Sequence, residues 1–273
     1  MSEPQPAHRP AVPPLAKLRA RPHWRTVDFI SDLHLKPEEP ATFEAWARYM
    51  AQTRADAVII LGDLFEAWVG DDAAAPGSFE ARCGGVLDAC PANLAFMRGN
   101  RDFLVGSDFL ARHGVRDLAA DPTVLECGAQ RIVLSHGDLL CTDDLPYQQF
   151  RQQVRSSDWQ HAFLARPLAE RQAIARQMRE HSEARHAATA PADYALTNAE
   201  LARQWLHAAG AHTLIHGHTH QPADHALGTG ADGHALTQVV LSDWHIDART
   251  HRAQVLRLSA DGARTRLDPD AAG

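Results

Sequence analysis

Five short polar segments, each following or nearly following an apolar strand-like run, restrict what this chain can fold into. They are Asp32-Leu33-His34, Gly62-Asp63, Gly99-Asn100, Ser135-His136-Gly137 and Gly217-His218-Thr219-His220. Their carboxylate, imidazole and amide groups are ligands that suit manganese, iron, cobalt or zinc. Two divalent ions close together need ligands from several strand ends that converge on one rim. The pattern predicts an α/β fold with parallel strands and a two-metal site at their carboxyl ends.

The first two segments supply the candidate carboxylate ligands. Asp32 and His34 lie two positions apart, so in an extended segment both side chains point the same way and can reach one ion. Asp63 follows the apolar run 58–61, where a carboxylate is costly unless it is paired or coordinated. We expect Asp63 to bridge two ions because a carboxylate spreads its charge to both, and helix capping is the alternative.

Each of the other three segments is, by itself, weak evidence for a metal site. Asn100 is also typical of a turn, and a lone strand-end histidine such as His136 is more often structural. His216, His218 and His220 alternate, which lets imidazoles face one side of an extended segment. All five segments in this order, however, are specific for a metal centre.

Length and composition are those of a globular protein with one large α/β domain. Of the 273 residues, 45% are hydrophobic and 22% are charged. The net charge of −7 argues against nucleic-acid binding by a basic surface. The four cysteines have no CxxC spacing and residues 1–25 have no apolar signal-like segment, so we expect reduced thiols in the cytosol.

The expected organisation is a proline- and arginine-rich tail at 1–25, a domain at 26–267 and a short tail at 268–273. Within the domain, apolar runs predict strands at 26–31, 57–61 and 93–97, which alternate with helices at 42–54 and 78–89. Ser107 is expected to cap a short helix, and 123–126 and 131–134 to form a hairpin. Strands at 212–215, 236–242 and 253–258 finish the domain.

Residues 145–190 contain no strand-like run, which predicts a helical insertion at about 145–195. Ser157 and Thr197 are expected to cap helices, because Gln160 and Glu200 complete capping boxes three residues later. Apolar side chains of the insertion alternate with arginines, a pattern typical of a basic cap that faces acyl chains and an anionic membrane surface. A helical hairpin that simply packs on the core is the alternative.

In this order the D-x-H, G-D, G-N, strand-end histidine and G-H-x-H segments resemble those of the calcineurin-like metallophosphoesterases. The resemblance implies a β-sandwich flanked by helices, in four layers ordered αββα, here with a helical lid insertion. It also implies two ions. One would be held by Asp32, His34, Asp63 and His220, and the other by Asp63, Asn100, His136 and His218.

This chain departs from that superfamily at Arg101, where most members have a histidine that acts as an acid or stabilises charge. Expelling an alkoxide benefits from an acid, whereas a phosphate monoester is already a good leaving group. An arginine there suits gripping a second phosphate. We therefore expect a pyrophosphate diester as the substrate.

Longer segments are similar to one family in particular, the UDP-2,3-diacylglucosamine pyrophosphohydrolases of lipid A biosynthesis. They are GDLFEAWVGDD at 62–72, GNRDFL at 99–104, SHGDLLCTDD at 135–144 and HGHTHQP at 216–222. The resemblance implies hydrolysis of UDP-2,3-diacylglucosamine to UMP and 2,3-diacylglucosamine 1-phosphate with two Mn²⁺ ions. It also implies peripheral contact with the inner membrane from the cytoplasm, and we expect a monomer.

By the same resemblance Asp63, His218 and Arg101 would be the catalytic residues. Substrate contacts would come from Asn100, Arg101, Asp144, Tyr147 and His218. That family often carries lid lysines near the substrate phosphates, and the region 183–198 has none here. Arg185 and Asn198 are the remaining candidates in that region.

Two other functions stay open. One is a metallophosphoesterase acting on another nucleotide-linked diester, although a soluble nucleotide needs no apolar cap. Exposed Trp159 and Phe163 would favour the lipid substrate. The other is a metal-binding scaffold without catalysis, against which the complete set of seven ligand positions argues.

Overall fold

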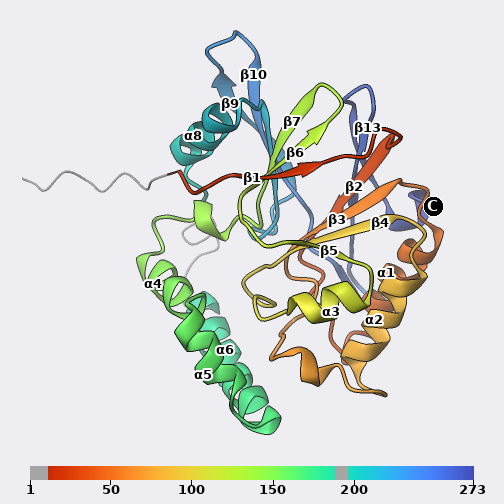
Figure 1. The fold of residues 1–273 in the computed structure, drawn as a ribbon, viewed down its shortest axis with the longest axis vertical. Coiled ribbons are helices and arrows are strands. Elements are labelled where there is room, and N and C mark those ends of the chain that lie inside the picture. Colours follow the sequence, from red (N-terminus) through yellow and green to blue (C-terminus); the bar gives the residue numbers. More distant parts are fainter. Residues whose placement is uncertain (1–11, 188–195) are drawn as a thin grey trace, which may run out of the picture.

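Two six-stranded β-sheets face each other at the centre of the molecule (Figure 1). The computed structural model describes residues 12–187 and 196–273, with side chains up to residue 180 and from 196 onward. The first sheet is ordered β1 (Ala16–Arg19), β6 (Thr123–Cys127), β7 (Gln130–Leu134), β8 (Thr213–His216), β10 (Ala235–Val240) and β9 (Ala223–Thr229). The second is ordered β14 (Arg264–Leu267), β13 (Val255–Ser259), β2 (Thr26–Ile30), β3 (Ala57–Leu61), β4 (Asn93–Met97) and β5 (Arg116–Leu118). A separate ribbon pairs β11 (His245–Ile246) with β12 (His251–Arg252).

The central strands of the second sheet are apolar throughout because both of their faces are covered. In β3, Ala57, Ile59 and Leu61 point into the core between the sheets. The alternate residues Val58 and Ile60 belong to the core beneath the helices. Because β2, β3 and β4 pair in parallel, their carboxyl ends lie at one edge of the sheet, as expected.

Helices cover the outer face of each sheet, as Figure 1 shows. The second sheet is covered by α1 (Pro40–Gln52), α2 (Phe79–Ala89) and α3 (Ser107–Arg112), through buried side chains such as Trp46 and Phe109. The first sheet is covered by α8 (Ala199–Ala209), through side chains such as Trp205. The layers are therefore α, β, β and α, which confirms the expected fold class.

The helical insertion is α4 (Leu145–Val154), α5 (Ser157–Leu164) and α6 (Leu168–Ala187), which lie together at the lower left of Figure 1. Trp159 stacks on Phe163 at 4.8 Å and lies 6.0 Å from the ring of Phe103 on the core. Phe163 is only 5% exposed and Trp159 is partly buried, so neither ring is fully exposed as the sequence suggested. None of the described helices is both long and apolar enough to cross a bilayer.

Arg171 of α6 anchors the insertion rather than contributing to a basic surface. Its guanidinium donates to the Asp72 carboxylate at 2.8 Å and to the carbonyl of Val69. The side chain is 3% exposed. A buried arginine needs such partners because an unpaired charge in the interior is costly. The segment around Asp72 is therefore fixed to the insertion.

Both predicted tails take part in the fold within the described residues, which corrects the expected domain bounds. β1 pairs in parallel with β6, and Leu18 is fully buried in the core between the sheets. At the other end Ala272 is fully buried, and its carbonyl accepts a hydrogen bond from Arg257 at 2.7 Å. Amid the high proline and arginine content lies a four-residue strand in which Leu18 is the single buried residue.

Three predicted helix caps are also wrong, two of them by one residue. Ser156 caps α5 and Asn198 caps α8, instead of Ser157 and Thr197. Ser107 does not cap α3, whose first residues are instead held by a distant side chain. The Asp71 carboxylate accepts from the backbone N–H groups of Gly106 at 2.8 Å and of Phe109 at 2.9 Å.

Candidate metal centre and adjoining cavity

The polar segments that follow five strands converge at one edge of the sandwich. Asp32, Asp63 and Asn100 come after β2, β3 and β4 of the second sheet. His136 and the pair His218 and His220 come after β7 and β8 of the first sheet. The seven ligand candidates are thus brought together by both sheets rather than by the rim of one.

Five of these residues have a left-handed backbone. They are Asp32 (φ 54°), His34 (φ 50°), Asp63 (φ 53°), His218 (φ 69°) and His220 (φ 54°), the only non-glycine residues with positive φ in the described ranges. This conformation costs on the order of 1–3 kcal/mol per residue and persists where the surroundings impose it, typically at functional sites. The expectation that Asp32–His34 and His216–His220 are extended is therefore wrong, since sharp turns direct these side chains inward.

Two glycines allow the segments to approach closely. A Cβ on Gly99 would collide with the side chain and backbone N of Asp63, and a Cβ on Gly217 would collide with the side chains of Asp32 and Ser31. Gly99 precedes Asn100, so the first contact brings together ligand candidates from the neighbouring strands β3 and β4. Gly217 precedes His218, so the second brings together candidates that follow β2 and β8, which belong to different sheets. The glycines of the G-N and G-H motifs are thus required because a side chain at either position would collide with the neighbouring segment.

One group of candidate ligands consists of Asp32, His34 and His220. One ligand atom from each lies within 4.8 Å of the others. The Nε2 atoms of His34 and His220 are 3.1 Å apart, and His220 Nε2 is 3.5 Å from Asp32 Oδ1. Two ring nitrogens and a carboxylate oxygen aimed at one point are a donor set that fits a divalent transition metal ion.

The second group surrounds Asn100. Its Oδ1 lies 2.8 Å from His136 Nε2 and 2.8 Å from His218 Nδ1. His136 Nε2 is 3.8 Å from Asp63 Oδ2. One ligand atom each from Asp32, Asp63 and His136 also lies within 4.8 Å of the others. Asp32 therefore lies close to the ligand candidates of both groups, and the two groups adjoin.

Burial and charge in this centre leave several ligands ready for a cation. Burial raises the pKa of Asp63 to about 7. Burial lowers the pKa of His34 well below its usual value and that of His218 to about 3, so both rings are neutral with free lone pairs. Burial also lowers the pKa of His136, but the carboxylates of Asp63 and Asp138 outweigh it and raise this pKa to about 9. A bound cation would offset the electrostatic repulsion between the buried carboxylates.

Asp102 holds two of the ligand-bearing turns through their backbones. Its carboxylate accepts from the N–H groups of Leu64 and Gly99, both at 2.8 Å. It therefore orients Asp63 and Asn100 without touching their side chains. The buried ring of His216 lies with its Nε2 atom 2.7 Å from the side-chain Nε2 of Gln238.

Helix α4 contacts the loops of the second group through one face. Tyr147 Oη and Arg151 Nε both donate to Asp138 Oδ2 at 2.7 Å, two residues after His136. Arg155 donates to the carbonyl of Gly99 at 2.8 Å. Tyr147, Arg151 and the C-cap residue Arg155 are spaced by four and form a single stripe. This spacing is visible in the sequence, but from the sequence alone the arginines of the insertion are interpreted only as a basic cap.

The predicted substrate contacts are placed as follows. Arg101 donates through its backbone to Asp63 Oδ1 at 2.8 Å and through its guanidinium to Glu66 at 3.1 Å. Asp144 caps α4 by accepting from the N–H of Tyr147, whose ring lies 6.0 Å from that of His218. Asn198 caps α8 and donates to the hydroxyl of Thr142 at 3.0 Å. The side chain of Arg185 lies outside the described residues.

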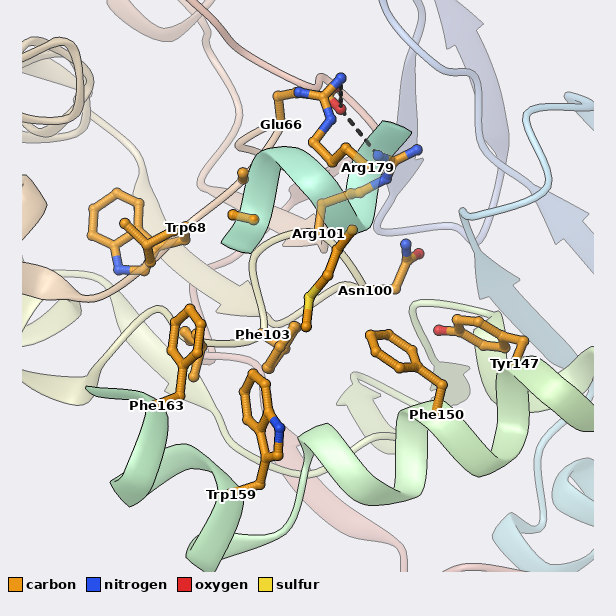
Figure 2. A pocket seen from close by; sticks show the side chains of 15 residues that line it. Glu66, Trp68, Asn100, Arg101, Phe103, Tyr147, Phe150, Trp159, Phe163 and Arg179 are labelled. Carbon is orange, nitrogen blue, oxygen red and sulfur yellow. Dashed lines mark hydrogen bonds and ion pairs between the residues drawn. The ribbon is translucent and has the colours of Figure 1, made fainter. Parts of the chain in front are cut away.

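A cavity of about 430 Å³ adjoins the metal centre beneath the insertion. Figure 2 shows Asn100, Arg101 and Tyr147 on one side of it and the aromatic rings of Trp68, Phe103, Trp159 and Phe163 on the other. Arg179 of α6 forms an ion pair with Glu66 at 2.7 Å, on the same carboxylate oxygen that Arg101 contacts. Glu66 and Arg179 were missed from the sequence, because only the fold brings α6 to the segment after β3.

Comparison with known proteins shows the family of this chain. Residues 25–222 match the family model of the calcineurin-like phosphoesterases, and the chain belongs to this family, as a metal-dependent hydrolase. A curated relative from Stenotrophomonas maltophilia (strain R551-3), named UDP-2,3-diacylglucosamine hydrolase, is 44% identical over 87% of this chain and 96% of its own. A relative of the same name from Chromobacterium violaceum is 48% identical over 80% of this chain and 90% of its own. A solved structure of a novel archaeal phosphodiesterase aligns with a TM-score of 0.44 at 12% identity, covering 89% of this chain and 98% of its own.

Proposed function

We propose that this protein hydrolyses UDP-2,3-diacylglucosamine to UMP and 2,3-diacylglucosamine 1-phosphate (lipid X). The observation that carries the proposal is that an apolar cavity and the cluster of metal-ligand candidates adjoin each other. The aromatic cavity reaches Asn100 and Arg101, and Asn100 lies in the cluster of metal-ligand candidates. A substrate with a diphosphate and two acyl chains needs both surfaces side by side, and the names of the curated relatives favour this substrate.

The ligand sets we propose are those that the sequence suggested, with Mn²⁺ as the metal. One ion would be held by Asp32, His34, Asp63 and His220, and the other by Asp63, Asn100, His136 and His218. Asp63 would bridge the two. Bound ions of this kind polarise the attacked phosphoryl group and increase the acidity of water.

The hydrolysis we propose occurs at the α-phosphate. The oxygen of water bonds to the α-phosphorus, and the bond from that phosphorus to the bridging oxygen breaks. The electron pair leaves with 2,3-diacylglucosamine 1-phosphate, whose phosphate needs little protonation. Arg101, oriented by Glu66, would hold the neighbouring phosphate, and His218 would position the developing charge. Asn100, Asp144, Tyr147, Arg185 and Asn198 would contact the polar part of the substrate.

Access to an acylated substrate would require peripheral contact with the inner face of the inner membrane, from the cytoplasm. Large apolar side chains are exposed on and beside the insertion at Leu145 (65%), Leu164 (39%) and Leu196 (64%). Exposed leucines next to an acyl-binding cavity suit shallow contact with a lipid surface. We propose that the protein acts there as a monomer.

The experiment compares three substrates with the Mn²⁺-loaded protein. UDP-2,3-diacylglucosamine tests the proposal, UDP-N-acetylglucosamine lacks the long chains, and bis-p-nitrophenyl phosphate lacks the diphosphate. We expect UMP and lipid X from the first substrate, with a much smaller kcat/KM for the other two. Efficient cleavage of bis-p-nitrophenyl phosphate with UDP-2,3-diacylglucosamine left intact would overturn the lipid assignment and leave the family assignment standing.

A further inference from the structure

We propose that His212, Asp232 and His234 form a second metal site, which binds a divalent ion of the zinc or nickel type. His212 directly precedes β8, whereas His218 of the metal centre follows the other end of that strand. Asp232 and His234 lie in the turn between β9 and β10, the hairpin at the top of Figure 1. The length of β8 therefore separates the proposed site from the metal centre.

The three side chains offer ligand atoms at suitable distances. One ligand atom from each lies within 4.8 Å of the others. Asp232 Oδ2 is 2.6 Å from His212 Nε2 and 3.4 Å from His234 Nδ1. Ligands at about 2.0–2.1 Å from a tetrahedral ion are about 3.3 Å apart, so small side-chain rotations suffice to admit the ion. The two imidazole rings face each other at 4.8 Å, with 30° between their planes.

The backbone holds this arrangement independently of any metal. Asp232 Oδ1 accepts from the N–H of His234 at 3.1 Å, which leaves Oδ2 directed at both imidazoles. The turn is closed by the hydrogen bond from Gly230 N to the carbonyl of His234 at 2.8 Å. The carbonyl of His212 accepts from the N–H of Thr237 on β10 at 2.9 Å, which fixes His212 beside the hairpin. Prior ordering of ligands reduces the entropy lost on binding.

The donor set determines which ion is expected. Two imidazoles and one carboxylate favour zinc, nickel or copper, whereas manganese binds such nitrogen-rich sites more weakly. All three side chains are accessible to solvent, with exposed fractions of 42%, 52% and 70% for His212, Asp232 and His234. An ion could therefore enter without any movement of the fold and retain water at its open position. The site would fasten the β9–β10 hairpin to the start of β8.

Metal counting on the untagged full-length chain tests this inference. The protein is loaded with Mn²⁺, dialysed against Zn²⁺, and both metals are counted by elemental analysis. We expect the unaltered chain to bind about one zinc more than Asp232→Asn and His234→Ala, as one three-ligand site would. Zinc that displaces manganese from the metal centre is recognised because the manganese count falls by the same amount.

His251→Ala is the matched control, because His251 is an exposed histidine paired with one carboxylate, Asp268 at 3.3 Å. This variant should keep the extra zinc. Zinc should also raise the unfolding temperature of the unaltered chain and of His251→Ala, but not of the two site variants. Equal zinc counts in the unaltered chain and the site variants, or loss of the extra zinc in His251→Ala, would overturn the inference. All variants should keep Mn²⁺-dependent hydrolysis, since none alters the metal centre.

Discussion

A buried ion pair between Asp138 and Arg151 joins the helical insertion to the loop that carries His136. Arg151 Nε lies 2.7 Å from Asp138 Oδ2, and the Asp138 side chain is fully buried. Burial alone would raise the pKa of Asp138, but Arg151 and other cationic groups hold it well below its usual value. The position of α4 and the position of one ligand candidate are therefore set by the same contact.

Replacing Arg151 should destabilise the protein strongly. Arg151→Met leaves the Asp138 charge buried, with the hydroxyl of Tyr147 still donating to Oδ2 at 2.7 Å. Removing one member of a buried pair costs about 3–5 kcal/mol in the free energy of unfolding. Denaturant unfolding measures this loss. The matched control is Arg166→Met, whose exposed pair with Glu170 at 4.0 Å should contribute about 1 kcal/mol or less. Equal losses of stability in Arg151→Met and Arg166→Met would contradict the stabilising role of the buried Asp138–Arg151 pair.

Asp71, and not Ser107, should be the residue that stabilises the start of α3. Its carboxylate accepts from two N–H groups there and from the indole N–H of Trp68 at 3.1 Å. Asp71→Ala should therefore lower the free energy of unfolding by about 1–2 kcal/mol, as the loss of a cap does. Ser107→Ala should change it by less than about 0.5 kcal/mol, the usual range for surface substitutions. The reverse ranking in thermal or denaturant unfolding would show that the sequence-based cap was correct.

The aromatic cavity should control activity on the acylated substrate. Trp159→Ala removes an indole that packs against Phe103 and Phe163 and lines the cavity. Loss of about 1.5–3 kcal/mol of apolar contact should lower kcat/KM for UDP-2,3-diacylglucosamine roughly 10- to 100-fold. Activity on bis-p-nitrophenyl phosphate, which has no long chains, should change little. His161→Ala, an exposed residue on the same helix but outside this cavity, should leave both activities near the original values. A similar loss on both substrates in Trp159→Ala would instead indicate a damaged fold.

The metal-free protein should lose stability as the pH rises from about 7 to 9. The surrounding carboxylates raise the pKa of His136 to about 9, against a usual value of 6.5, despite its burial. The folded state thus holds a proton that the unfolded state has released, and this stabilisation disappears as the pH rises through about 9. Thermal unfolding of metal-free and Mn²⁺-loaded protein across this range measures the effect. The loaded form should change less, because a coordinated imidazole is already deprotonated. A metal-free protein that gains stability from pH 7 to 9 would contradict the assigned charge state.

The sequence predicted the sheet strands well where a continuous apolar run ended in a polar residue. β3 and β4 have the expected bounds, and Asp63 and Asn100 follow them at the expected edge. A strand that is buried on both faces is a continuous apolar run, and a short stretch of sequence is enough to detect such a run. The left-handed turns at Asp32 and His34 could not be predicted, because contacts with other strands impose them.

Residues that act through distant partners were missed for the same reason. Arg151 and Arg171 look like surface charges along their helices, yet their partners Asp138 and Asp72 lie in segments that only the fold brings near. Leu18 likewise gives no periodic signal, because a single buried residue in a short edge strand has no repeat to detect.

The most direct test of the central claim is to locate the oxygen that water contributes. UDP-2,3-diacylglucosamine is hydrolysed by the Mn²⁺-loaded protein in ¹⁸O-water, beside Asp63→Ala, and both phosphate products are analysed by mass spectrometry. The account predicts that the label enters UMP, that lipid X stays unlabelled, and that Asp63→Ala forms neither product. Label in lipid X instead of UMP would place the attack on the other phosphorus, and full activity of Asp63→Ala would contradict the proposed metal centre.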